Sequence, residues 1–128
     1  MIRVAVAGAG RMGQAIAGLI ESRDDMQLVG TWRRGEDLGS LVGAADVVID
    51  FSLPDGTVQV LEAVRRHQTP LVCGVSGLDE RQLAQLERVS AAVPLVYDRN
   101  MSPGVAVLNR ACLLYTSDAA DDWLVVWV

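Results

Sequence analysis

Short apolar runs alternate with segments in which apolar residues recur every three or four positions, as far as about residue 111. The runs are rich in β-branched residues and stop at glycine, proline or acidic residues, which is typical of buried strands. The three- and four-residue spacing is typical of one apolar face of a helix. Strands are predicted at 3–7, 26–32, 46–51, 71–73 and 93–97, and helices at 12–20, 38–42, 55–67, 79–92 and 105–111. The alternation predicts an α/β fold: a doubly wound, parallel, Rossmann-like sheet in a single domain, with right-handed crossovers.

The helical spacing also predicts which residues are buried. The expected inward residues are Met12, Ala15, Ile16, Leu19 and Ile20 in the first helix, Val58, Leu61 and Ala63 or Val64 in the helix at 55–67, and Leu83, Leu86 and Val89 in the helix at 79–92. The turn at 52–56, which contains Pro54, is expected to supply a helix N-cap.

The first predicted strand leads directly into Gly8-Ala9-Gly10-Arg11-Met12-Gly13, and a helix follows. A strand and a helix joined by G-x-G-x-x-G form the dinucleotide-binding fingerprint. Gly8 would allow the tight turn, Gly10 would let a pyrophosphate approach the backbone, and Gly13 would let the helix lie close to the strand. The free N–H groups and the positive dipole end of the helix would then face the phosphates. The alternative is a glycine-rich turn that binds nothing, but the strand before it and the helix after it favour binding.

The second predicted strand ends at Arg33 and Arg34, where the fingerprint usually has an acid that accepts a hydrogen bond from the adenosine ribose. Guanidinium groups suit a ribose 2′-phosphate, because they donate forked, charge-assisted hydrogen bonds. NADPH is therefore the favoured cofactor. Glu36 and Asp37 follow closely, so NADH stays open, and a solvated basic turn is the alternative without a ligand.

Composition and charge exclude several classes of function. A chain of 128 residues with a net charge of −5 and no run of lysines or arginines argues for one domain and against a nucleic-acid surface. No apolar stretch reaches the roughly eighteen residues of a membrane span, and the apolar N-terminal run is too short for a signal peptide. Cys73 and Cys112 are far apart without metal-ligand spacing, so we expect reduced, packed thiols in a cytoplasmic protein.

The sequence shows neither a metal site nor a nucleophile with its base. His67 is the only histidine, and it is expected on the surface near the end of a predicted helix. Ser52, Ser76 and Ser102 have no visible base, so nucleophilic catalysis is not predicted.

Four segments at the ends of predicted strands carry a family resemblance. They are Gly8–Gly13, Val48–Thr57 (VIDFSLPDGT), Val72–Leu78 (VCGVSGL) and Asn100–Val105 (NMSPGV). In this order they resemble the N-terminal domain of dihydrodipicolinate reductase, the 4-hydroxy-tetrahydrodipicolinate reductase of bacterial lysine and diaminopimelate synthesis. The resemblance covers about residues 1–109 and is more specific than the glycine fingerprint alone. It implies a cytosolic enzyme that passes a hydride from NADPH or NADH to a small cyclic dicarboxylate.

The resemblance also implies a role for each matching residue. Gly8, Ala9, Gly10, Arg11, Met12 and Gly13 would cradle the pyrophosphate, Arg33 and Arg34 would meet the adenosine ribose, Phe51 and Ser52 would flank the nicotinamide side, Gly74, Val75 and Ser76 would line the nicotinamide and substrate edge, and Asp98, Arg99, Asn100 and Met101 would close it. Ser76 keeps a hydroxyl for a substrate carboxylate. Many relatives have Thr-Thr in place of Val75-Ser76 and one more residue in the first glycine loop.

The chain also departs from the family in length. Relatives continue into a second domain, whose His-His-Arg-His-Lys stretch supplies the proton donor and a carboxylate-binding lysine and whose sheet builds a homotetramer. We therefore expect no catalytic residue here, and a cofactor-binding fragment that is inactive alone. The domain is expected to span residues 1–111. Residues 112–128 resemble translated sequencing-adapter read-through and are expected not to be native to the family; the alternative is a natural C-terminal strand on the sheet edge.

Two other functions stay open. One is a stand-alone NAD(P)-binding sensor or regulatory module without chemistry. The other is a truncated aspartate or homoserine dehydrogenase, against which the motifs at 48–57 and 100–105 argue.

Overall fold

The computed structural model describes residues 1–98 and the backbone of Val125–Trp127. Its elements are β1 (Ile2–Ala7), α1 (Arg11–Glu21), β2 (Met26–Trp32), α2 (Leu38–Gly43), β3 (Val47–Asp50), α3 (Pro54–His67), β4 (Leu71–Cys73), α4 (Glu80–Ser90), β5 (Leu95–Tyr97) and β6 (Val125–Trp127). The helix expected at 105–111, Cys112 and the segment Asn100–Val105 lie outside the described residues.

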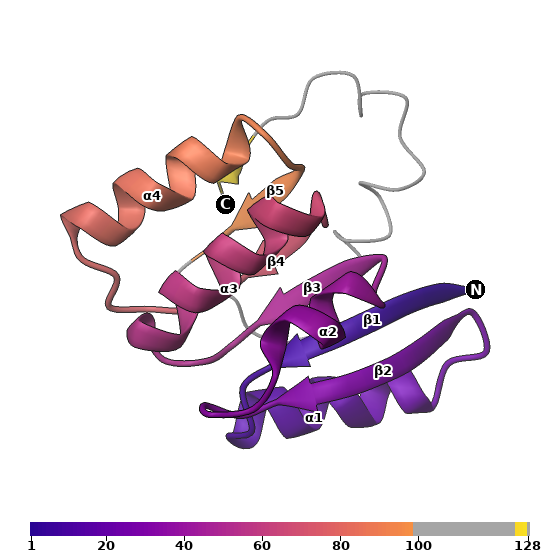
Figure 1. The fold of residues 1–128 in the computed structure, drawn as a ribbon. Coiled ribbons are helices and arrows are strands. Elements are labelled where there is room, and N and C mark those ends of the chain that lie inside the picture. The colour runs from indigo at the N-terminus through magenta and orange to yellow at the C-terminus, as the bar shows by residue number, and fades with distance from the viewer. Residues whose placement is uncertain (99–124, 128) are drawn as a thin grey trace.

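The strands form one parallel sheet in the order β2-β1-β3-β4-β5-β6 (Figure 1). In the register, Val6 of β1 is the neighbour of both Thr31 in β2 and Ile49 in β3. All the described strand pairs are parallel, which confirms the predicted sheet. Because parallel strands point the same way, their carboxyl ends meet at one edge of the sheet.

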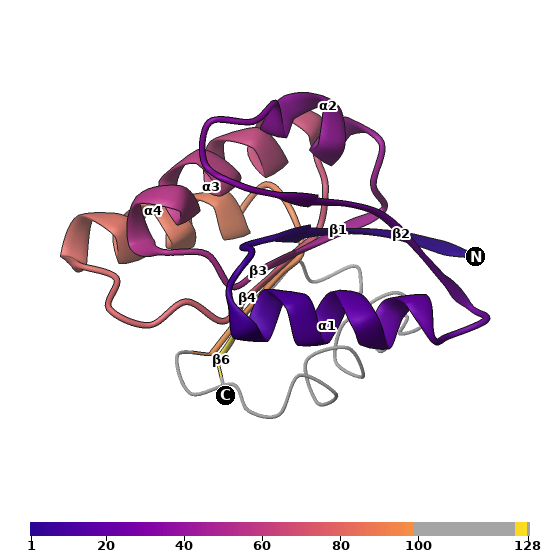
Figure 2. The ribbon, with the colours of Figure 1, turned by 90° about the horizontal axis from the view of Figure 1, so that it is seen from below.

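The helices cover both faces of the sheet, as a doubly wound fold requires. Figure 2 shows α1 on one face and α2, α3 and α4 on the other. The chain runs outward from β1 to β2, then crosses back past β1 to β3 and continues in the opposite direction through β4 and β5. Right-handed crossovers place the helices of the two directions on opposite faces. The direction changes between β1 and β3, and such a switch point opens a crevice at the carboxyl edge.

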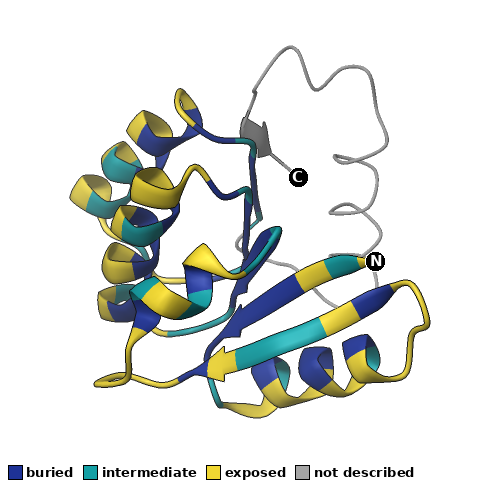
Figure 3. Ribbon diagram, turned by 45° about the vertical axis from the view of Figure 1, so that its right-hand side comes forward, coloured by how far each residue is buried: buried dark blue, intermediate teal, exposed yellow. Residues whose placement is uncertain are grey.

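Two apolar clusters hold the layers together. Val4 and Val6 of β1 pack with Ile16 and Ile20 on the α1 face. Ala5 and Ala7 point the other way, toward the cluster that α2, α3 and α4 cover. This alternation follows from the two-residue period of a strand, and it makes β1 buried on both faces (Figure 3).

Two of the predicted inward residues are wrong. Ala15 is exposed and Ala17 is buried in its place, because α1 turns Gly13, Ile16, Ala17 and Ile20 toward the sheet. Val58 is 37% exposed, since α3 packs through Val60, Leu61 and Val64. Ala15 and Val58 both lie at the edge of the apolar face of their helix, where the three- and four-residue spacing does not decide whether a residue faces the sheet or the solvent.

The helix starts use different chemistry. Asp79 and Gln82 form a capping box at α4, and the Asp37 side chain accepts a hydrogen bond from the Ser40 N–H at α2. The turn before α3 was expected to supply an N-cap, and the N-cap is Leu53, whose side chain cannot cap. Pro54 compensates in part, because it occupies the first turn and has no N–H to satisfy.

β6 lies at the edge of the sheet, parallel to β5, with Val126 as the neighbour of Val96. A strand on the sheet edge is the arrangement that the alternative interpretation of the C-terminal segment expects. The origin of residues 112–128 stays a prediction.

Candidate functional site

A cavity of about 360 Å³ opens at the carboxyl ends of β1, β2 and β3, at the switch point of the sheet. It is lined by Gly8, Ala9, Gly10, Trp32, Arg33, Arg34, Phe51, Ser52, Leu53 and Gly56. The edge that it occupies is where open α/β sheets bind their ligands. The glycine loop, the arginine pair and the Phe51–Ser52 segment, which the sequence placed at one site, thus line a single cavity.

Gly8 and Gly13 are required by backbone packing. Gly8 has φ +115°, and a Cβ there would lie 2.8 Å from the carbonyl atoms of Phe51. A Cβ on Gly13 would collide with the carbonyl oxygen of Gly8. A Cβ on Gly10 would meet nothing within 4 Å, so this residue faces open space beside the cavity. The turn at Gly8 and the close approach at Gly13 therefore have the causes that the sequence predicted.

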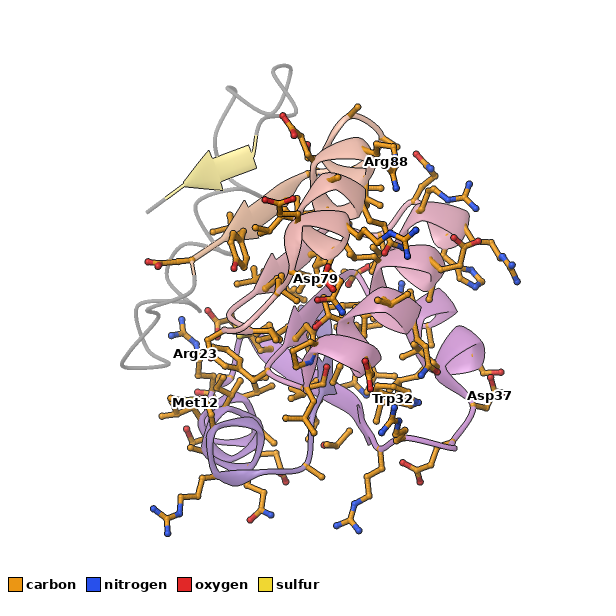
Figure 4. All side chains as sticks on the ribbon, turned by 90° about the vertical axis from the view of Figure 1, so that its left-hand side faces the viewer. Met12, Arg23, Trp32, Asp37, Asp79 and Arg88 are labelled. Atoms are coloured by element: carbon orange, nitrogen blue, oxygen red, sulfur yellow. The ribbon has the colours of Figure 1, made fainter. Side chains whose placement is uncertain are left out.

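α1 begins directly after this loop. Gly10 is the N-cap, no side chain caps the helix, and its first turn contains no acidic residue. The Gln14 side chain donates a hydrogen bond of 2.8 Å to the Ala9 carbonyl and so fixes the loop. Arg11 and Met12 lie in the first turn but outside the cavity lining; Met12 packs on the α1 face of the sheet, opposite to Trp32 (Figure 4).

The acids near Arg33 and Arg34 are engaged within their own turns. Glu36 Oε1 accepts a hydrogen bond of 2.7 Å from the Arg33 N–H, and its carbonyl accepts one of 3.1 Å from the Trp32 indole. Both carboxylate oxygens of Asp37 accept hydrogen bonds from Ser40, which hold the pKa of Asp37 below its usual value. The arginines are thus the charged side chains that line the cavity.

Arg34 also forms an ion pair with a residue in the first turn of α3. Its guanidinium lies 3.1 Å from Asp55 Oδ2, with side chains 64% and 74% exposed. A pair this exposed contributes little to stability and can open when a stronger anion is present.

Asp50, at the end of β3, holds the cavity wall at Phe51–Leu53 through hydrogen bonds with Ser52. Asp50 is fully buried, and its Oδ1 accepts hydrogen bonds from the Ser52 N–H (2.9 Å) and the Ser52 hydroxyl (2.6 Å). Its Oδ2 accepts one from the Thr57 hydroxyl (2.8 Å), and Cys73 Sγ lies 3.9 Å away. Burial raises the pKa of Asp50, and the hydrogen bonds from Ser52 and Thr57 oppose that shift.

Sequence reasoning did not include Asp50 among the site residues. The available signal was an acid that ends an otherwise apolar strand, with a serine two residues later and a threonine seven residues later. Trp32, Leu53 and Gly56 also line the cavity without having been expected there.

The loop after β4 lies beyond the Phe51 ring. A Cβ on Gly74 would collide with that ring, so Gly74 and Phe51 are in direct contact. Val75 is buried and its carbonyl accepts a hydrogen bond from the Tyr97 hydroxyl, whereas Ser76 is exposed. Gly74, Val75 and Ser76 therefore stand beside the cavity without lining it. Asp98 follows β5, and Arg99, Asn100 and Met101 lie outside the described residues.

A family model described as "Dihydrodipicolinate reductase, N-terminus" matches residues 2–101. The chain belongs to the dihydrodipicolinate reductase family. The 4-hydroxy-tetrahydrodipicolinate reductase of Campylobacter jejuni is 42% identical over 110 residues, which are 85% of this chain and 46% of the relative. That of Bdellovibrio bacteriovorus is 39% identical over 118 residues, 91% of this chain and 52% of the relative. The chain spans about half the length of these reductases.

Solved structures show the same fold. A dihydrodipicolinate reductase from Paenisporosarcina sp. TG-14, described as dipicolinate-bound, aligns with a TM-score of 0.65 at 19% identity, over 91% of this chain and 54% of that one. A pyrroline carboxylate reductase from Plasmodium falciparum, described with NADP bound, aligns with a TM-score of 0.59 at 15% identity, over 99% of this chain and 57% of that one.

In this member of the dihydrodipicolinate reductase family, His67 is exposed at the end of α3, as predicted. Cys73 is a buried free thiol, also as predicted, and burial together with the neighbouring Asp50 raises its pKa well above the usual value. Within residues 1–98, no three histidine, cysteine or acidic side chains come together as metal ligands would. The helices of that same part of the chain are all too short or too polar to cross a membrane.

Proposed function

We propose that this chain is the cofactor-binding part of an NAD(P)H-dependent reductase of dihydrodipicolinate or 4-hydroxy-tetrahydrodipicolinate, in lysine and diaminopimelate synthesis. The observation that carries the proposal is the cavity at the switch point, which has the glycine loop on one side and the arginine pair on another. The names of the reductase relatives support the substrate, and dipicolinate in one related structure is itself a cyclic dicarboxylate.

The proposed binding mode follows the order of the strand ends. The pyrophosphate lies on Gly8–Gly13, where the N–H groups of the loop and of the α1 N-terminus donate to its oxygens. The adenosine ribose lies toward Arg33 and Arg34, beyond β2. The nicotinamide extends the other way, past Phe51 and Ser52, to the loop of Gly74, Val75 and Ser76 and to the segment 98–101. Ser76 then offers its exposed hydroxyl to a substrate carboxylate.

NADPH is the cofactor that these contacts favour. A 2′-phosphate can replace Asp55 as the anion beside Arg34, because the exposed ion pair between them is weak. Glu36 and Asp37, which could have favoured NADH, are engaged with the backbone of Arg33 and with Ser40.

The proposed cofactor supplies the hydride, and the residues of this chain bind and orient it. We assign no catalytic residue here, since the family resemblance places the proton donor and the carboxylate-binding lysine in a second domain. The chain is thus expected to bind cofactor without turning over substrate. We also propose that residues 1–111 form the family domain, that residues 112–128 are foreign to it, and that a full-length relative is a cytoplasmic homotetramer.

Calorimetric titration of the 128-residue chain with NADPH and NADH tests the proposal. Arg34→Ala is expected to weaken NADPH binding by about 1.5–3 kcal/mol, the range of a charged hydrogen bond, and to leave NADH binding nearly unchanged. Arg33→Ala is the parallel test. Arg88→Ala is the matched control, because Arg88 is also exposed but lies on α4, away from the cavity (Figure 4).

Absence of binding by the folded chain would reject the proposal. Equal loss of NADPH and NADH affinity in Arg34→Ala would reject the 2′-phosphate contact alone. Reading the full-length gene past residue 109 separates the reductase from a stand-alone NAD(P)-binding sensor, since only the reductase is expected to continue there into a segment rich in histidine and lysine.

A further inference from the structure

The hydroxyl of Ser52 donates its proton to Asp50 and not toward the cavity. Its oxygen lies 2.6 Å from Asp50 Oδ1 but 3.3 Å from the next acceptor, the Leu53 carbonyl. A hydroxyl has one proton to donate and two lone pairs that accept. Because the shorter contact is to a carboxylate, the proton points to Asp50, and the Ser52 oxygen can only accept a hydrogen bond from whatever enters the cavity.

Asp50 is built to impose this orientation. Its carboxylate is fully buried and surrounded by hydrogen-bond donors: the Ser52 N–H and hydroxyl on one oxygen, and the Thr57 hydroxyl on the other. The Cys73 thiol is a fourth, weak donor from β4. None of the buried side-chain polar atoms of the described residues is left without a hydrogen bond, so this network is complete as it stands.

Gly56 leaves the Ser52 hydroxyl in place. A Cβ on Gly56 would lie 2.8 Å from Ser52 Oγ and 3.3 Å from a ring carbon of Trp32. The missing side chain therefore allows α3 to start close against the wall without displacing the hydroxyl.

The cavity is thereby polarised. One side presents donors and positive charge, namely the N–H groups of the glycine loop and α1 and the guanidinium groups of Arg33 and Arg34. Ser52, which also lines the cavity, presents an acceptor oxygen next to a buried carboxylate. A phosphate oxygen carries only lone pairs, so it is favoured beside those donors and disfavoured beside the Ser52 oxygen, whereas a sugar hydroxyl can donate to Ser52.

We propose that Asp50 is a positioning residue that holds the Ser52 hydroxyl as an acceptor toward the cavity, so that this wall selects a ribose hydroxyl of the dinucleotide and rejects its phosphates. The inference rests on the proposed function and adds to it the orientation of the nucleotide. In the proposed binding mode the ribose concerned is the one that carries the nicotinamide, because that mode runs the nicotinamide past Phe51 and Ser52.

The test compares NADPH with 2′,5′-ADP, which keeps the phosphates next to the adenosine ribose but lacks the second ribose. Ser52→Ala is expected to weaken NADPH binding about tenfold, the loss of one hydrogen bond to a ligand, and to leave 2′,5′-ADP binding within about twofold. Asp50→Ala is expected to act in the same way as Ser52→Ala. Asp50→Asn keeps one acceptor oxygen, and it is expected to restore most of the NADPH affinity that Asp50→Ala loses.

Ser90→Ala is the control, since Ser90 is a buried serine on α4 whose hydroxyl donates to the Glu87 carbonyl, outside the cavity. If Asp50→Ala does not fold, the Ser52→Ala comparison decides alone. Equal losses for NADPH and 2′,5′-ADP, or no loss for either, would overturn the positioning role while leaving the proposed function intact. Failure of the unaltered chain to bind 2′,5′-ADP would instead count against the proposed function.

Discussion

Substituting alanine for each of two glycines in one helix tests how the glycine loop is built. Gly13 and Gly18 both lie in α1, but a Cβ at Gly18 would meet nothing within 4 Å, whereas one at Gly13 would collide with the Gly8 carbonyl oxygen and lie 2.8 Å from its carbon. Carbon atoms in ordinary contact are about 3.5–4.0 Å apart, so α1 would have to retreat by roughly 1 Å. That movement would loosen Ile16 and Ile20, which are fully buried against the sheet.

The two effects have opposite signs. Replacing a helical glycine by alanine stabilises the helix by about 1 kcal/mol, and this gain applies at both positions. At Gly13 the clash is with backbone, which cannot rotate away, so we expect an overpacking cost near the upper end of its range, about 3 kcal/mol. Gly18→Ala should therefore raise the free energy of unfolding by about 1 kcal/mol, and Gly13→Ala should lower it by about 2 kcal/mol.

Urea unfolding followed by far-ultraviolet circular dichroism measures both variants against the unaltered chain. The far-ultraviolet signal reports mainly the helices of the domain. Equal stabilisation by Gly13→Ala and Gly18→Ala would refute the reasoning, because it would mean that the loop and α1 do not approach as closely as the structure shows.

Three further outcomes are expected. The raised pKa of Asp50 means that the folded chain binds the carboxyl proton more tightly than the unfolded chain, so the stability that this proton contributes is lost as the pH rises above the ordinary pKa of 3.8. Asp50→Asn should therefore gain stability relative to the unaltered chain over that rise in pH, as measured by urea unfolding at several pH values. A stability difference that stays constant with pH would contradict this expectation. Asp79→Ala removes the capping box of α4 and should lower the free energy of unfolding by about 1 kcal/mol, with no change counting against the cap. Gly56→Ala should push the Ser52 hydroxyl aside and weaken NADPH binding in calorimetry, and an unchanged affinity would show that the wall tolerates a methyl group.

The sheet could be predicted from the sequence because its central strands are apolar on both faces. Leu71–Cys73 has the predicted bounds because turn residues stop its apolar run, and so does the edge strand Met26–Trp32, which lies between two polar turns. Strand ends were less certain: the predicted strand at 93–97 is Leu95–Tyr97, because a proline cannot donate to the ladder. The rotation of a helix depends on what it packs against, which is why Val58 was misplaced.

Some features of the candidate site could likewise be predicted from the sequence, and others could not. Gly8 and Gly13 could be found from the sequence because the backbone geometry of a strand–loop–helix unit is local and demands glycine. Asp50 contacts Ser52 and Thr57 within one short segment, which the sequence could have indicated, but its contact with Cys73 joins β3 to β4, and no spacing along the chain states that these strands converge. The Arg34–Asp55 pair was missed for the same reason, since its residues are brought together by the fold.

Gly8 has a consequence for how fast a ligand can be captured. Its N–H donates a 3.0 Å hydrogen bond to the Trp32 carbonyl at the end of β2, and a Cβ on it would lie 2.8 Å from the Phe51 carbonyl group beyond β3. Gly8 thus connects the ends of β1, β2 and β3, and this part of the cavity wall is continuous with the sheet. This part of the binding site is therefore preformed. Association of a ligand should be limited by diffusion and orientation, and the loop should lose little conformational entropy on binding.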